Sequence, residues 1–153
     1  EDLIQWAPDP VTSMWYPMNI GQARTQGTEL SFAQQLDEQV NHELGLTLLN
    51  WTTNGSPLLR RPDLQFNYSL NYTGERASAS LETCYVGRRM DTFGFNTDWG
   101  RAYLVFNLSG QYNLDRDTKA WLRVENLFDA QYEAVGGYPS PGFGIYGGVT
   151  RAL

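Results

Sequence analysis

The sequence has few of the residues on which enzymes and metal proteins commonly depend. It contains one cysteine, Cys84, and one histidine, His42, which excludes an intrachain disulfide and a cage of Cys and His ligands. Cys84 is expected to be a small residue in the wall of the fold. His42 lies beside a predicted short turn, which favours an interfacial or solvated role over a catalytic one. No loop has the regular spacing of oxygen ligands that forms a calcium cage. We therefore expect no catalytic site, no metal and no cofactor, and the chain is not predicted to be an enzyme.

Long apolar runs and an excess of positive charge are also missing. No stretch approaches the roughly 18 consecutive apolar residues of a transmembrane helix. Lysine and arginine number 11 against 17 aspartate and glutamate residues, giving a net charge of −6. A nucleic-acid partner is not expected, because phosphate binding needs a basic surface. The apolar fraction of 41% still permits a membrane β-barrel, since each strand there presents only alternate side chains to lipid.

Alternation of apolar and polar residues is the strongest pattern present. From Leu64 to Tyr72 every even position is leucine or aromatic, and every odd position is Gln, Asn or Ser. A similar alternation runs from Ala102 to Leu114. Weaker versions occur at 43–48, 77–85, 119–125 and 143–150, with an incomplete first strand near 3–6. The pattern predicts about eight strands, each with two different environments on its two faces.

The predicted connections alternate between short and long. Tight turns are expected at 36–39, 72–76 and 114–117, and longer links near 7–19, 52–60, 91–100 and 128–141. Outer-membrane barrels have this asymmetry, with short turns on the periplasmic side. The apolar positions also carry Tyr72 and Tyr112 near short turns and Tyr85 near a long link, as suits lipid–water interfaces. The sequence predicts an all-β, transmembrane, antiparallel up-and-down β-barrel; the alternative is a soluble antiparallel sandwich with a recognition role.

Motifs near the end of the chain resemble those of a known family. Val124-Glu125-Asn126-Leu127-Phe128-Asp129, followed by Tyr132 and the run 137–142, is similar to the C-terminal signature of TonB-dependent outer-membrane receptors. Upstream, the segments 19–24, 27–30 and 59–62 resemble strands that these receptors carry before their end. The Gly-Tyr-x-x-Pro-Gly pattern of 137–142 most resembles cobalamin receptors. The resemblance covers nearly the whole chain.

The resemblance implies a receptor of the bacterial outer membrane. Such receptors have a 22-stranded barrel around an N-terminal plug, so residues 1–153 would be about eight C-terminal strands of one, starting inside a strand. The implied function is energy-coupled uptake of a scarce nutrient, either cobalamin or an iron–siderophore or haem chelate. The implied partners are membrane lipid, the plug, a small-molecule ligand, and the inner-membrane protein TonB through an N-terminal region outside this chain. The alternative is a self-contained eight-stranded barrel with an adhesin, enzyme or structural role.

Ligand contacts are expected from aromatic residues in the longer connections. Large, flat, amphipathic side chains provide contact area at a small entropic cost, which suits a macrocycle or a chelate. The alternative is that they form an outer interfacial belt. The candidates are Trp15, Tyr16, Trp51, Phe93, Phe95, Trp99 and Tyr138.

Charged residues on the polar phase of the strands form a second candidate set. Each would cost up to a few kcal/mol in lipid, so these residues are expected to face the barrel lumen. There they would pair with one another or with the plug; the alternative is a hydrated wall. The set comprises Glu29, Glu43, Glu82, Arg88, Arg123 and Glu125.

Overall fold

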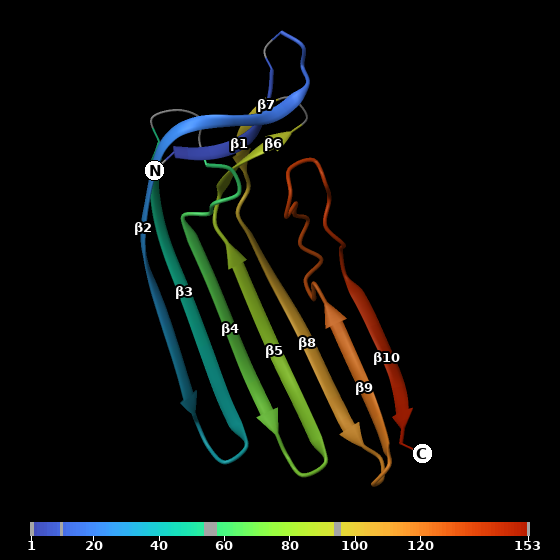
Figure 1. Ribbon diagram of the computed structural model, residues 1–153. Helices are drawn as coiled ribbons and strands as arrows, with labels where there is room; N and C mark the ends of the chain where they lie inside the picture. The colour runs from blue at the N-terminus through green and yellow to red at the C-terminus, as the bar shows by residue number, and fades with distance from the viewer. Residues whose placement is uncertain (1, 10, 54–57, 94–95, 153) are drawn as a thin grey trace.

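In the computed structural model the chain forms an eight-stranded antiparallel sheet and a separate two-stranded hairpin (Figure 1). The structure describes residues 2–9, 11–53, 58–93 and 96–152. The main sheet has the order β1 (Asp2–Pro8), β2 (Trp15–Gln35), β3 (Val40–Thr53), β4 (Leu64–Thr73), β5 (Ala77–Val86), β8 (Tyr103–Asn113), β9 (Thr118–Glu125) and β10 (Gly144–Arg151). Strands β6 (Arg89–Phe93) and β7 (Asn96–Gly100) form the hairpin. Over the described ranges, no helix has the length and apolar character needed to span a bilayer.

The two ends of the sheet differ, as the sequence predicts. The three tight turns lie together at the lower end of Figure 1, and the long connections gather at the upper end, which we call the loop end. Two of the turns are closed by aspartate: Asp37 Oδ1 accepts the N–H groups of Gln39 and Val40, and Asp115 repeats the arrangement in the last turn. Such side-chain bonds are typical of tight turns. The predicted short turns are confirmed.

The strand register places the apolar positions of β2 to β5 and β8 to β10 on one face. Leu46 lies opposite Phe66, Phe66 opposite Tyr85, and Tyr85 opposite Leu104, so these rows run across the sheet. This apolar face is uncovered: Leu122 on β9 is 47% exposed and Leu30 on β2 is 55% exposed. A continuous exposed apolar face is what strands in contact with lipid require.

The opposite face is polar and carries side-chain hydrogen bonds between strands. Asn71 on β4 donates from Nδ2 to Asn41 Oδ1 on β3 at 3.0 Å and accepts the hydroxyl of Ser80 on β5 at 2.7 Å. The three residues are direct cross-strand neighbours. We call this set the Asn41–Asn71–Ser80 rung.

The prediction of a long link near 7–19 is wrong. Strand β1 continues to Pro8 and β2 begins at Trp15, which leaves a short turn closed by Asp9, whose Oδ1 accepts the N–H groups of Val11 and Thr12. The β1–β2 hairpin then bends over the top of the sheet (Figure 1). The bend coincides with a register shift opposite β1 and with Gly21, whose φ is +83°. Because the pairing is irregular here, the residues lose the simple alternation that reveals a strand.

The predicted link near 91–100 contains regular secondary structure that the sequence analysis did not predict. It contains most of the β6–β7 hairpin, which pairs Arg89 with Gly100 and Asp91 with Asp98. The link near 128–141 has no strand; an isolated bridge joins Val135 and Tyr138. Part of the link near 52–60 lies outside the described residues.

Candidate functional site

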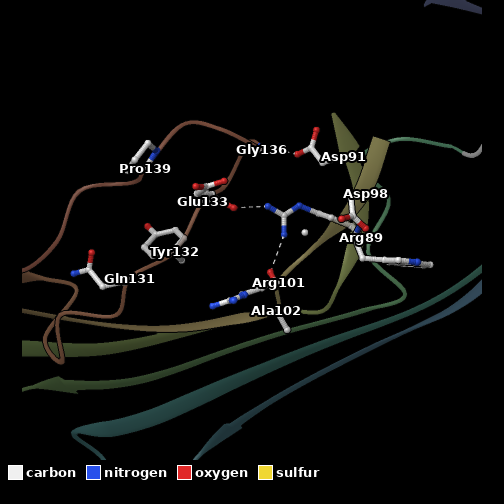
Figure 2. Close-up of a pocket in the computed structure, with 12 residues that line it drawn as sticks. Arg89, Asp91, Asp98, Arg101, Ala102, Gln131, Tyr132, Glu133, Gly136 and Pro139 are labelled. Atoms are coloured by element: carbon white, nitrogen blue, oxygen red, sulfur yellow. Dashed lines mark hydrogen bonds between the residues drawn. The ribbon is translucent and has the colours of Figure 1, made fainter. Parts of the chain in front are cut away.

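A cavity of about 500 Å³ lies at the loop end, between the β6–β7 hairpin, the start of β8 and the connection that joins β9 to β10 (Figure 2). Its volume lies within the range of about 300–1,000 Å³ typical of small-molecule sites. We call it the loop-end pocket. The residues that line it are Arg89, Asp91, Asp98, Trp99, Gly100, Arg101, Ala102, Gln131, Tyr132, Glu133, Gly136 and Pro139.

Arg89 is buried at one wall of this pocket, with 4% of its surface exposed. Its Nη2 donates to the carbonyl oxygens of Glu133 at 2.6 Å and Ala134 at 2.7 Å, and Nη1 reaches the carbonyl of Arg101 at 3.4 Å. The guanidinium carbon also lies 5.4 Å from the centroid of the Tyr103 ring. A buried cation needs such acceptors, because it has lost its contact with water. Arg89 therefore binds the backbone of the β9–β10 connection to the start of β6.

Asp91, two residues further along β6, is the most deeply buried charged side chain described. Its Oδ1 accepts hydrogen bonds from Arg60 Nε at 3.0 Å and from the Thr92 N–H at 2.8 Å, and its Oδ2 accepts the Gly136 N–H at 2.8 Å. Burial raises the pKa of this carboxyl, but the bonds from Gly136, Arg60 and Thr92 outweigh burial, and the pKa lies below its ordinary value. Asp91 is therefore ionised at neutral pH.

Aromatic rings form another part of the pocket region. The rings of Tyr103 on β8 and Tyr132 in the β9–β10 connection lie 4.4 Å apart at an interplanar angle of 32°. Trp99 on β7 is 49% exposed, and the guanidinium of Arg88 lies 4.9 Å from its ring centroid. Arg88 also approaches Asp63 at 4.0 Å. Exposed aromatic surface beside charged groups is suited to binding a large, partly polar small molecule.

The motif 126–129 shapes the connection that closes the pocket. Asn126 is 3% exposed and has a φ of +49°, a left-handed conformation that asparagine adopts more readily than most residues. Its Oδ1 accepts the Ala130 N–H at 2.8 Å, and its Nδ2 donates to the carbonyls of Ala130 and Pro141. Asp129, also left-handed, accepts the Phe143 N–H at 2.9 Å immediately before β10. These bonds set where the last strand begins.

The structure brings together only part of the predicted aromatic set. Trp99 lines the pocket, and Tyr138, 72% exposed, precedes the lining residue Pro139. Trp15 and Tyr16 begin β2 and are exposed, while Trp51 is half-buried in β3. Placing these three in connections was wrong, because β2 and β3 extend further toward the loop end than their alternation indicates, whereas Trp99 lies in the β6–β7 hairpin within the predicted link 91–100. For Phe93 the structure describes only a place in β6, and Phe95 lies outside the described residues.

The predicted charged set falls largely on the polar face. Glu43 and Glu82 both lie opposite Ser69, on either side of it, and Glu29 lies opposite Thr47. Arg123 and Glu125 form an ion pair of 3.3 Å on β9. Arg88 is different, since it follows β5 and stacks on Trp99 next to the loop-end pocket.

Sequence reasoning missed the residues that hold the pocket together. Arg60 and Arg89 each belong to an Arg-Arg pair, at 60–61 and 88–89, and no sequence pattern described above singles out either of them or Asp91. The sequence offers one signal for them: both Arg-Arg pairs fall in predicted long links or at strand ends. Charges there are not explained by the polar face of a strand. Nothing in the sequence indicates that residues 60, 91 and 136 meet.

Comparisons with known proteins agree with this geometry. Residues 1–127 match the family model described as "TonB dependent receptor-like, beta-barrel". The vitamin B12 transporter BtuB of Vibrio vulnificus (strain YJ016) is 30% identical over 141 residues, which cover 87% of this chain and 21% of that protein. The chain thus spans about a fifth of the length of this curated relative.

Two solved structures show the same fold. The copper transporter OprC superposes with a TM-score of 0.76 and 22% identity, covering 100% of this chain and 27% of OprC. The pyoverdine outer membrane receptor FpvA from Pseudomonas aeruginosa PAO1 gives a TM-score of 0.73 and 16% identity, covering 99% of this chain and 25% of FpvA. At these identities the likeness concerns the fold alone.

Proposed function

Because the chain belongs to the TonB dependent receptor-like β-barrel family, we propose that it is the C-terminal barrel portion of a receptor for energy-coupled uptake of a scarce nutrient. The barrels of this family lie in the bacterial outer membrane, and the family consists of receptors and transporters rather than enzymes. The predicted family, fold class and location are thereby confirmed. The nutrient, the plug and the coupling to TonB belong to the proposal.

Cobalamin is the proposed ligand. The supporting comparison is the relative at 30% identity, which is named a vitamin B12 transporter. The observation that carries the proposal is the loop-end pocket, where the exposed face of Trp99 stands beside the polar groups of Asp98 and Arg101. A pocket of this size would hold one edge of a corrin ligand, with its amide side chains against the charged groups.

An iron–siderophore or haem chelate is the second proposed ligand class. Arg101 is an exposed cation in the pocket lining, next to an aromatic surface, and this combination suits an anionic chelate with flat rings. The two ligand classes are separated by the binding experiment below.

We further propose that the polar face lines the barrel lumen and meets the plug. Glu43, Glu82 and the Arg123–Glu125 pair lie on this face, where water or a protein partner can solvate them. TonB would act on the plug rather than on the described strands.

The experiment is ligand binding by the full-length receptor in outer-membrane vesicles. Radiolabelled cyanocobalamin is expected to bind saturably, and intact cells should accumulate it only while the energy-coupling system is active. Trp99→Ala should weaken binding about tenfold, since a tryptophan in a binding site commonly contributes that much or more. Trp121→Ala, at the other end of the sheet, is the matched control and should leave binding unchanged.

Two outcomes would change the proposal. Binding of ferric siderophore or haem in place of cyanocobalamin would assign the second ligand class. Failure of energised cells to accumulate any of these ligands would overturn the uptake function.

A further inference from the structure

We propose that Arg89 and Asp91 are positioning residues for ligand binding: together they join three segments of the loop end and hold the two walls of the loop-end pocket at a fixed separation. This inference rests on the proposed function, because it concerns how the ligand pocket is held. Neither residue needs to touch the ligand.

The first observation is that Asp91 connects three segments through one carboxylate. It belongs to the β6–β7 hairpin, and its oxygens accept hydrogen bonds from Arg60, 31 positions earlier, and from Gly136, 45 positions later. The Arg60 segment is tied to the hairpin a second time, by the Arg60 N–H donating to the Met90 carbonyl at 2.8 Å. The carboxylate is thus the point at which all three segments meet.

The second observation is that Arg89 repeats the connection from the same strand. Its Nη2 binds the carbonyls of Glu133 and Ala134, which are 44 and 45 positions away. Residues two apart in a strand point to the same side, so Arg89 and Asp91 act on the same part of the β9–β10 connection. Charge-assisted hydrogen bonds are short and directional, and they therefore fix position as well as proximity.

The third observation is that, apart from Arg89 and Asp91, the contact described between this part of the connection and the rest of the loop end is the Tyr132 ring against Tyr103, and its other hydrogen bonds are internal. Residues 131–139 contain no strand, and the one bridge described there, between Val135 and Tyr138, is internal to the segment. The main sheet beneath is held separately by the pairing of β8, β9 and β10. Loss of the Asp91 contacts should therefore move the pocket wall without unfolding the sheet.

The consequence for binding is preorganisation. Gln131, Tyr132, Glu133, Gly136 and Pro139 line one wall of the pocket, and Asp98, Trp99 and Gly100 line the other. If the walls are held in place before the ligand arrives, the ligand does not bear the entropic cost of ordering them. Asp91 and Arg89 would then determine affinity by holding the walls in place.

The test begins with a distance measurement that needs no ligand. Spin labels are attached at positions 97 and 138 of the full-length receptor in lipid bilayers, in a Cys84→Ser background, so that each wall carries one label. The distance distribution is expected to be narrow in the parent protein and to broaden clearly in Asp91→Asn and Arg89→Ala. Arg89→Lys should restore part of the narrow distribution, because an ammonium can donate to the same carbonyls.

Affinity is then measured with cyanocobalamin on the unlabelled variants. Asp91→Asn and Arg89→Ala should weaken binding about tenfold, while the thermal midpoint of the barrel stays unchanged. Asp117→Asn, an exposed aspartate in the turn at the opposite end, is the matched control and should alter neither distance nor affinity. A purely structural role would instead lower the thermal midpoint and leave the distance distribution narrow.

An unchanged distance distribution in Asp91→Asn would overturn the inference, whatever the affinity. If the parent protein does not bind cyanocobalamin, the cobalamin proposal fails by itself. The distance measurements on the variants then support or overturn the positioning role independently.

Discussion

Arg60 Nε donates a 3.0 Å hydrogen bond to Asp91 Oδ1, yet the two side chains are very differently exposed, at 53% for Arg60 and 1% for Asp91. The carboxylate depends on its partners because it has almost no contact with water, whereas the guanidinium can return to solvent. Removing Arg60 therefore leaves a buried charge with one partner fewer, and removing Asp91 leaves an arginine that is readily solvated. Loss of Arg60 and loss of Asp91 should therefore destabilise the loop end by different amounts, although both break the same hydrogen bond.

Acid should release the β9–β10 connection only at low pH. Because the folded state lowers the pKa of Asp91, its contacts are fully present above the unfolded-state value of about 3.9 and are lost as pH falls through the folded value. The other charged groups near Asp91 are Arg60 and Arg89 and the acidic residues Asp98, paired with Asp91 across the hairpin, and Glu133. Amide hydrogen exchange at Gly136, corrected for intrinsic rate, should stay constant from pH 7 to 5 and accelerate only below about 3.9. Release between pH 7 and 5 would contradict this assignment.

Substitution of Asn126 should destabilise the end of the barrel. Asn126→Ala removes a buried side chain and leaves the Ala130 N–H and the Ala130 and Pro141 carbonyls without these hydrogen-bond partners, at a cost of about 1–3 kcal/mol. Urea unfolding of the receptor in lipid vesicles measures this cost. Asn113→Ala is the control, since Asn113 Oδ1 is buried without a hydrogen-bond partner in the described part of the chain and should be lost more cheaply.

Glycine is required at the bend of β2. Gly21→Ala forces a Cβ into a left-handed conformation at φ +83°, which costs about 1–2 kcal/mol. We expect faster hydrogen exchange in β1 and the first part of β2, with the rest of the sheet unaffected. Gly45→Ala should have no such effect, because a Cβ added there meets no atom within 4 Å.

A new charge on β4 should destabilise the protein on the apolar face and be tolerated on the polar face. Leu70→Arg places a cation on the apolar face, where contact with the bilayer interior costs up to about 2–4 kcal/mol. Ser69→Arg places it on the polar face, opposite Glu43 and Glu82, and should be tolerated. The free energy of folding into lipid vesicles distinguishes them. Equal destabilisation by both variants would argue against a lipid-facing apolar surface.

The strands of the sheet were predictable because each has one apolar face and one polar face. In β4 the alternation from Leu64 to Tyr72 left no ambiguity, and the structure gives Leu64–Thr73. The same reasoning located β5, β8, β9 and β10 to within one or two residues, although it shortened β3. Periodicity is informative wherever one face meets lipid and the other does not.

The pocket was not predictable, because the residues that form it show no such periodicity. The β6–β7 hairpin lies outside the main sheet, so its residues carry no lipid-facing alternation. The contacts of Asp91 join positions separated by 31 and 45 residues, and a single sequence has no periodicity that reports such pairs. Trp99 was predicted as a ligand-contact candidate, but its neighbours in the pocket were not. Asn126 was identified through a family motif. Only the structure shows that its side chain holds the β9–β10 connection by hydrogen bonds to the Ala130 and Pro141 carbonyls.

The Asn41–Asn71–Ser80 rung has a consequence for how the strands find their alignment during folding. A slip of one residue between β3 and β4 would turn apolar side chains to the wrong face and is strongly opposed. A slip of two residues keeps every side chain on its proper face and preserves the backbone ladder, so hydrophobicity cannot detect it. It would, however, separate Asn71 from Asn41, and the same slip between β4 and β5 would separate Asn71 from Ser80. The rung therefore discriminates between alignments that the lipid treats as equivalent.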